Sequence, residues 1–331
     1  MLKLLKSNNP VNYLLAFLLM AALWGYKFAV MPTAVDSGGF HSYFFRFSYE
    51  SALFQYIYTT IAFALAFAFA CYVSKANFRH QVVESGYQLP TLFFAMLTGS
   101  LINAQRFVPE IVATLFVALA ILRMFGMYNK HEAIRHSLDV GLLYGLSLLF
   151  AYKYIVLFPA LIVVMAIVKP ISWRDIVSFL VAQVFVVGVA FCLVWLYGDW
   201  QELIESVKAE FSVLVIGEKY NYLNYVFRIP VIYAVLVSLL SIFTLKVFRK
   251  AAEMKYHQSM LFILIYAGAF MLSPISSNES VWLMYFPLCY LLSNVIVNAK
   301  TFVVQQLVLY GLLICLVLSQ VLQAFYFDSI F

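Results

Sequence analysis

Charged residues are scarce in this sequence. Asp, Glu, Lys and Arg make up 11% of its 331 residues, whereas 65% of the residues are hydrophobic. Soluble domains carry about 25% charged residues, so this composition excludes an ordinary soluble protein. The hydrophobic residues form continuous runs, without the period-two alternation of a membrane β-barrel. We therefore expect an all-α, multi-pass integral membrane protein, with residues 1–331 forming a single transmembrane domain.

Motifs for binding metals or nucleotides are also missing. The four cysteines, Cys71, Cys192, Cys289 and Cys315, lie in apolar runs without C-x-x-C spacing, which argues against a metal site or a disulfide framework. No P-loop is present, so the chain itself is not expected to hydrolyse ATP. The net charge of +6 does not indicate nucleic-acid binding, because the basic residues follow the distribution expected around a membrane.

The apolar runs predict about eleven membrane spans. If the N-terminus is cytoplasmic and the C-terminus lies outside, the inner segments hold about twice as many Lys and Arg residues as the outer segments. This bias follows the positive-inside rule and supports the orientation. The expected spans are roughly residues 12–32, 51–74, 91–104, 111–126, 138–151, 155–168, 177–197, 226–247, 259–273, 281–299 and 302–324.

Several of these spans are short. Spans three to six and span nine have about 14–16 residues, fewer than the roughly 20 that cross a bilayer unaided. We expect the outer ends of spans three to six to lie below the membrane surface, around a recessed cavity. Residues 33–50 are expected to form an outer loop with an interfacial helix, and residues 198–224 an amphipathic outer helix.

A polar turn, residues 103–110, separates two of the short spans. It places Arg106, Pro109 and Glu110 within five residues. Proline and an acid suit the first turn of a helix, so the turn could be a simple helix start with an Arg106–Glu110 ion pair. Alternatively, Arg106 and Glu110 face a site at the outer surface together with Asp36. A cation at membrane depth is costly, which favours a functional role for Arg106.

Three stretches, in order, resemble motifs of the GT-C superfamily of polytopic glycosyltransferases, which take a sugar from a polyprenyl-phosphate carrier. They are Arg106-Phe-Val-Pro-Glu110, the run from Gly141-Leu-Leu-Tyr-Gly145 to Lys153 with the following Leu157-Phe-Pro-Ala-Leu161, and Tyr285-Phe-Pro-Leu-Cys-Tyr-Leu-Leu292. Asp36 lies in the first outer loop, where that superfamily keeps its catalytic acid. Many members have two acids there, and many have a soluble outer domain for which no counterpart is expected here.

The resemblance implies a GT-C-like core and a transfer of a sugar or related group at the outer face of the membrane. A bacterial inner membrane would be the natural location of such an enzyme. Asp36 would be the general base, and Glu110 would orient the acceptor or bind a divalent metal together with Asp36. Arg106 and Lys153 would bind the phosphate of the lipid carrier. Further substrate-binding candidates on the outer face are His41, Arg228 and Glu279.

Simpler interpretations of these residues stay open. Asp36 and His41 could be solvated loop residues, and Lys153 could extend to the membrane surface between Tyr152 and Tyr154. Glu110 could simply be an acid at a helix N-terminus, where the helix dipole favours a negative charge. The motifs themselves do not require any cofactor or resident metal.

Two other functions remain compatible with the sequence. The chain could be a non-catalytic, GT-C-like scaffold subunit of an envelope-assembly or protein-secretion complex, with other membrane-protein subunits as partners. The lone Asp36 favours this alternative. It could also be a lipid or solute carrier, although no inverted pair of broken hydrophobic segments is evident. In every case membrane lipids are expected partners, and nucleic acid is not.

Overall fold

The fold is known from a computed structural model, which describes residues 10–29, 43–44, 52–83, 88–105, 107–130, 132–212, 228–240, 250–273, 276–299 and 301–328. These residues form an all-helical protein without strands. The α-helices are α2 (Val11–Ala29), α3 (Ala52–His80), α4 (Leu89–Leu97), α5 (Pro109–Phe125), α6 (Ile134–Phe150), α7 (Phe158–Val168), α8 (Trp173–Tyr197), α9 (Trp200–Ser212), α12 (Ile229–Leu240), α13 (Ala251–Leu272), α14 (Trp282–Asn298) and α15 (Phe302–Asp328). Three 3-10 helices accompany them: η1 (Ile102–Ala104), η2 (Tyr152–Leu157) and η4 (Asn278–Val281).

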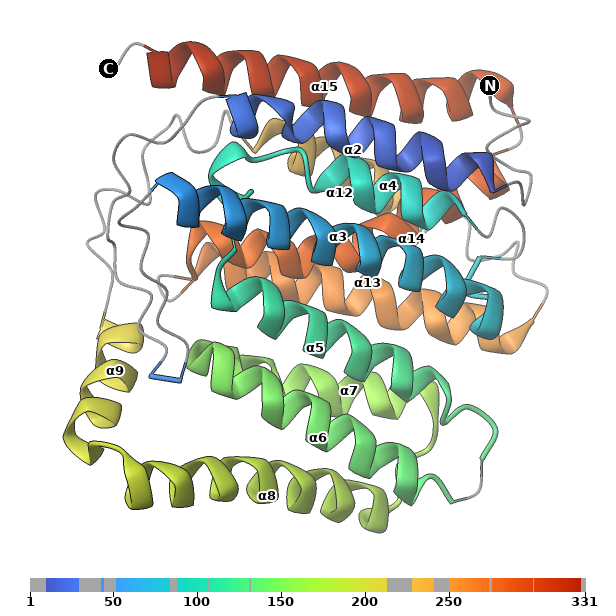
Figure 1. The fold of residues 1–331 in the computed structure, drawn as a ribbon. Helices are drawn as coiled ribbons and strands as arrows, with labels where there is room; N and C mark the ends of the chain where they lie inside the picture. The colour runs from blue at the N-terminus through green and yellow to red at the C-terminus, as the bar shows by residue number, and fades with distance from the viewer. Residues whose placement is uncertain are drawn as a thin grey trace.

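All helices except α9 run roughly along one direction, side by side (Figure 1). Each of the eleven predicted spans contains one of them, and α9 is the amphipathic helix expected within residues 198–224. Five segments are long and apolar enough to cross a membrane: Val11–Ala29, Leu53–His80, Trp173–Tyr197, Glu279–Asn298 and Phe302–Phe325. Their number makes a multi-pass membrane protein the natural interpretation, while the count of eleven spans stays a prediction.

Helix α14 lies at the centre of the bundle. Every residue from Trp282 to Ile296 is buried, and a helix that is apolar on all sides belongs in a core. It packs against α4, α13 and α12. Its few polar side chains find partners: Tyr285 and Ser100 share a hydrogen bond of 2.6 Å, and Asn294 Nδ2 lies 3.1 Å from His257 Nδ1. The core is therefore built around a segment near the end of the chain.

The pairing of α6 with α8 explains the Gly-x-x-x-Gly motif. A Cβ atom at Gly141 would collide with the backbone carbonyl of Phe179 and lie 2.7 Å from the Cβ of Ala182. One at Gly145 would lie 3.0 Å from the Cβ of Val186. Small residues at this spacing let two membrane helices approach closely. The motif used for the family resemblance thus has a packing role of its own.

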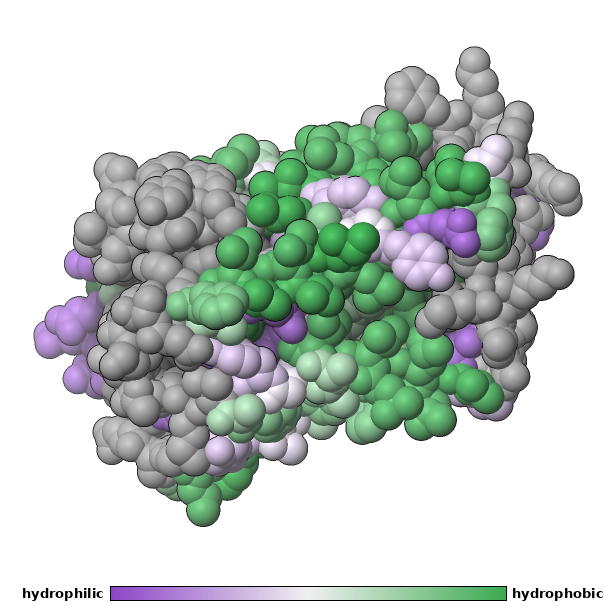
Figure 2. Space-filling view, turned by 90° about the horizontal axis from the view of Figure 1, so that it is seen from above, coloured by the Kyte–Doolittle hydropathy of each residue, from purple (hydrophilic) through white to green (hydrophobic). Residues whose placement is uncertain are grey.

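Two helices expose broad apolar faces. On α8 the exposed side chains include Leu180, Val184, Phe185 and Trp195, and α15 exposes residues such as Val303, Leu307 and Ile314. Figure 2 shows the face over α15 and α2, where apolar side chains dominate the middle of the molecule. Soluble monomers rarely expose apolar patches this continuous, whereas lipid-facing helices do.

The predicted bounds of several spans differ from the observed helices, most of all in the third and ninth spans. The third span, expected over 91–104, ends as an α-helix at Leu97, and its last residues form the separate 3-10 helix η1. Polar groups there bond to other helices: Gln323 Oε1 accepts from the amide of Ile102 (2.9 Å), and the indole of Trp282 donates to the carbonyl of Ala104 (3.1 Å). The ninth span is longer than expected, because α13 begins at Ala251 and has 22 residues.

Candidate functional site: a buried lysine among three glutamates

The beginning of α5 places Glu110 and Thr114 on one side of the helix. Pro109 occupies the start of the helix and Glu110 its first turn, as the sequence predicts. Thr114 follows one turn later and therefore lies on the same face. Both side chains are buried, with 9% of Glu110 and 3% of Thr114 exposed. The α5 start is thus an internal feature of the bundle.

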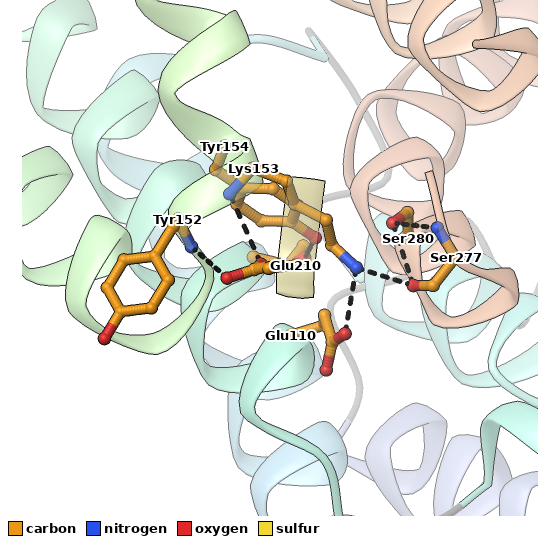
Figure 3. A network of polar contacts seen from close by, with 8 residues as sticks. Glu110, Tyr152, Lys153, Tyr154, Glu210, Ser277 and Ser280 are labelled. Carbon is orange, nitrogen blue, oxygen red and sulfur yellow. Dashed lines mark hydrogen bonds and ion pairs between the residues drawn. The ribbon is translucent and has the colours of Figure 1, made fainter. Parts of the chain in front are cut away.

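Lys153 meets Glu110 from the 3-10 helix η2. Its Nζ atom lies 2.9 Å from Oε1 of Glu110 and 2.8 Å from Oγ of Ser277, and it donates to both (Figure 3). Only 3% of the Lys153 residue is exposed, so the side chain does not extend to the membrane surface. A buried ion pair of this kind is costly to form and very costly to break from one side.

Two further glutamates surround this pair. The carboxylate of Glu210, on α9, accepts the backbone amides of Tyr152 (3.0 Å) and Lys153 (3.3 Å). Glu279, in η4, is buried and close enough to act on Lys153 electrostatically. We call Glu110, Lys153, Glu210, Ser277 and Glu279 the Lys153 cluster. It joins α5, η2, α9 and η4, which are distant in sequence.

The Lys153 cluster has more negative than positive groups. Three carboxylates act on the single ammonium group. Burial, together with the nearby carboxylate of Glu110, raises the pKa of Glu210, although Lys153 and the two backbone amides oppose that rise. The second carboxylate oxygen of Glu110, Oε2, is buried and has no hydrogen-bond partner in the described part of the chain. An unsatisfied buried acceptor is unusual and marks a place where a ligand could donate a hydrogen bond.

Tyrosine hydroxyls hold the backbone around Lys153. The hydroxyls of Tyr154 and Thr114 are 2.7 Å apart. The hydroxyl of Tyr144 donates to the carbonyl of Tyr154 at 2.8 Å, and that of Tyr266 donates to the carbonyl of Val156 at 2.6 Å. The 3-10 helix η2 is therefore anchored from α5, α6 and α13, and its geometry does not depend on the ion pair alone.

The structure brings together some of the residues predicted from the sequence. Glu110, Lys153 and Glu279 belong to one cluster. Arg228 lies just before α12 and acts electrostatically on Tyr285, and it is not among the groups in contact with Lys153. Asp36, His41 and Arg106 lie outside the described residues, as does most of the loop 33–50. The ion-pair partner of Glu110 in the described chain is Lys153, which is 43 residues away.

The alternative in which Lys153 extends to the membrane surface does not fit the structure, because Glu110 and Ser277 hold its ammonium group inside the protein. Glu210 was not predicted as a site residue. Glu202 and Glu205 are also polar positions of the same amphipathic helix, and the sequence does not distinguish Glu210 from them. Within the described residues, no group of three or more His, Cys, Asp or Glu side chains is arranged to hold a metal ion. A metal shared by Glu110 and Asp36 therefore stays a prediction.

The fold and this cluster define the class: an all-helical protein with five helices long and apolar enough to cross a membrane, and with a buried ionic cluster where several of its helices end. The chain belongs to DUF6427, described as a family of unknown function, whose sequence pattern matches residues 41–326. No curated protein and no solved structure matches the chain. The family thus encloses nearly the whole helical bundle without assigning an activity to it.

Proposed function

We propose that the chain is a GT-C-like membrane protein that transfers a sugar or related group from a polyprenyl-phosphate carrier to an acceptor in the cell envelope. Eleven spans in a bacterial inner membrane, with the N-terminus cytoplasmic, would place the Lys153 cluster at the outer face. The observation that carries the proposal is the buried Oε2 of Glu110, which has no hydrogen-bond partner among the described residues and lies beside the Lys153 ammonium group. Ionisable groups at membrane depth are costly and are commonly kept for function.

The proposed reaction moves one proton and exchanges one bond. The hydroxyl oxygen of the acceptor forms a bond to the anomeric carbon of the sugar, while the bond between that carbon and the phosphate oxygen breaks. Asp36 takes the proton of the hydroxyl, and the polyprenyl phosphate leaves with the electron pair. A phosphate leaving group needs no general acid. Glu110 would orient the acceptor by accepting a hydrogen bond at Oε2.

The geometry changes the role that we assign to Lys153. Two of its three N–H donors bind Glu110 and Ser277, and three carboxylates surround it. We therefore propose that Lys153 positions Glu110 and offers one donor to the phosphate, while Arg106 supplies the main phosphate contact. Arg228 and Glu279 would line the approach, and His41 would lie on the side of Asp36.

A scaffold subunit of an envelope-assembly or secretion complex is the second candidate, and a specific observation favours it. The excess of carboxylates over cations around Lys153 repels a phosphate, and the protein itself satisfies most of the Lys153 donors. On this alternative, the Lys153 cluster fixes the positions of η2, α9 and η4 and has no substrate.

The two candidates predict different results in cells that lack the gene. For the enzyme, polyprenyl-phosphate-linked sugars extracted from the membranes should accumulate, as measured by mass spectrometry. Wild type should reverse the accumulation, whereas Asp36→Asn and Glu110→Gln, present at normal levels, should not. Glu205→Gln, an exposed change on α9, is the matched control and should behave as wild type.

The enzyme proposal fails if both site variants restore normal levels of the lipid-linked sugars, or if no such species accumulates in the deletion strain. Co-purification of a membrane-protein partner in equal amounts, retained by the site variants, would then support the scaffold. A merely structural role for Glu110 would lower the amount of protein, which is why each comparison is made at equal protein level.

A further inference from the structure

The opposite end of the bundle contains a cavity lined by lysines. Helices α5 and α7 begin at the Lys153 cluster, and the cavity lies where both of them end. Its volume is about 350 Å³, within the range of small-molecule sites, which starts at about 300 Å³. We call it the lysine pocket, and its lining includes Tyr128, Lys130, Lys169, Pro170 and Lys255.

Three different segments bring these lysines together. Asn129 adopts a left-handed conformation (φ 58°), which asparagine tolerates better than most residues, and turns the chain after α5 at Lys130. Lys169 follows the last residue of α7, and Lys255 comes from the first turns of α13. The pocket is therefore a product of the tertiary fold, and no short motif encodes it.

Only one of the three lysines has a carboxylate partner among the described residues. Lys169 lies 3.0 Å from Oδ2 of Asp175. Lys130 donates to Nε2 of His136 (2.9 Å), an uncharged acceptor in this arrangement. Lys255 donates to the carbonyl of Val168 (3.2 Å), and its ammonium group lies 5.5 Å from the centre of the Tyr128 ring. Within the part of the chain that the structure describes, the positive charges of Lys130 and Lys255 thus have no carboxylate partner.

Nearby acids do not offset these charges. Asp139 binds Arg123, and Glu132 lies 3.7 Å from Arg174. Each of these carboxylates already has a cation of its own. An anion entering the lysine pocket would therefore meet a net positive field in a partly enclosed space, where charge interactions are stronger than in water.

The surroundings of the pocket indicate a membrane interface. Pro170 lines the pocket, and three residues later Trp173 begins α8 with 71% of its surface exposed. Arg174 lies over the Trp173 ring at 5.8 Å. Beyond them α8 exposes a continuous apolar face. Tryptophan and arginine at the start of such a face are typical of the headgroup region of a bilayer.

We propose that the lysine pocket binds the phosphate of an anionic phospholipid headgroup. Basic pockets between membrane helices on the cytoplasmic side are suited to such headgroups, and the uncompensated Lys130 and Lys255 supply charge-assisted donors. The proposal does not rest on the proposed transfer reaction, because the pocket shares no residue with the Lys153 cluster. Failure of the transfer assay would leave it intact.

The test uses the full chain, purified in a neutral detergent and titrated with short-chain phosphatidylglycerol, with short-chain phosphatidylcholine as the neutral lipid. Phosphatidylglycerol should bind saturably and raise the unfolding temperature, and phosphatidylcholine should not. The double variant Lys130→Gln/Lys255→Gln should weaken phosphatidylglycerol binding roughly tenfold, as expected for the loss of two charge-assisted contacts.

Two further variants make the result specific. Lys130→Arg/Lys255→Arg keeps both charges and should retain the affinity. Lys75→Gln removes one exposed charge of α3 outside the pocket and should have little effect. The proposal is overturned if the double Gln variant binds like wild type, or if Lys75→Gln weakens binding as much. Saturable binding of inorganic phosphate without binding of short-chain phosphatidylglycerol would overturn the assignment to a lipid.

Discussion

The bundle has a buried lysine–carboxylate pair at each end, and the two pairs have opposite surroundings. Lys153 and Glu110 lie among further carboxylates, whereas Lys169 and Asp175 lie among further lysines. The same ion-pair chemistry is therefore embedded in an acidic environment at one end and a basic environment at the other. A salt bridge alone does not indicate what a site binds, because the uncompensated groups around it decide the sign of the ligand.

The largest effect should come from removing Lys153. Lys153→Met leaves three carboxylates close together in a buried site, so we expect a loss of about 3–5 kcal/mol in stability. Lys169→Met should cost less, about 1–3 kcal/mol, because Ser172 still donates its amide to Asp175. Thermal unfolding in detergent measures both. Equal losses would show that the surroundings of the two pairs do not matter.

A change in the contact between α6 and α8 should destabilise both ends of the bundle alike. Gly141→Ala forces a methyl group against the carbonyl of Phe179, and we expect a loss of about 1–3 kcal/mol. Gly188→Ala on α8 is the matched control, because its Cβ would meet no atom within 4 Å. Hydrogen exchange should increase around both Lys153 and Lys169 in Gly141→Ala. An increase confined to one end would mean that α6 and α8 do not couple the two ends.

Hydrogen bonds between uncharged groups should contribute similar amounts to the free energy of unfolding at the two ends of the bundle. Thr114→Val removes the partner of the buried Tyr154 hydroxyl, and Tyr256→Phe removes the donor to the Phe125 carbonyl (3.0 Å) near the lysine pocket. Each should cost about 0.5–1.5 kcal/mol, measured by chemical or thermal unfolding. A much larger cost for Thr114→Val would indicate that Tyr154 also supports the ion pair.

The smallest expected effect is a pH dependence at the acidic end. Burial raises the pKa of Glu210 above its usual 4.5. Between 4.5 and the raised pKa of the folded state, the folded protein therefore binds more protons than the unfolded chain. Stability from this group therefore falls as the pH rises through that window. Glu210→Gln should flatten the slope of unfolding free energy against pH just above 4.5, and Glu205→Gln should leave it unchanged. An identical slope in Glu210→Gln would contradict the raised pKa.

Individual residues show how far the sequence could predict the structure. The helix start at Pro109–Glu110 was confirmed, because proline and an acid favour that position locally. Of the amphipathic helix expected over 198–224, the described part, Trp200–Ser212, is helical for the same local reason. The partner of Glu110 could not be found in this way, since Lys153 is equally compatible with a membrane-surface position. Glu210 was missed because its role depends on where α9 folds back against η2.

By itself the sequence determined that the chain is helical and that several helices are long and apolar enough to cross a membrane. A helix satisfies the backbone polar groups of a long apolar run within the run itself. The sequence also determined most helix positions, which depend on local apolar patterns and helix starts. Only the tertiary structure decided which charges meet: Lys153 with Glu110 and Glu210 at one end, and Lys130 with Lys169 and Lys255 at the other. A direct ion pair needs its two charged atoms within about 4 Å of each other, so which charges pair depends on the packing of distant segments.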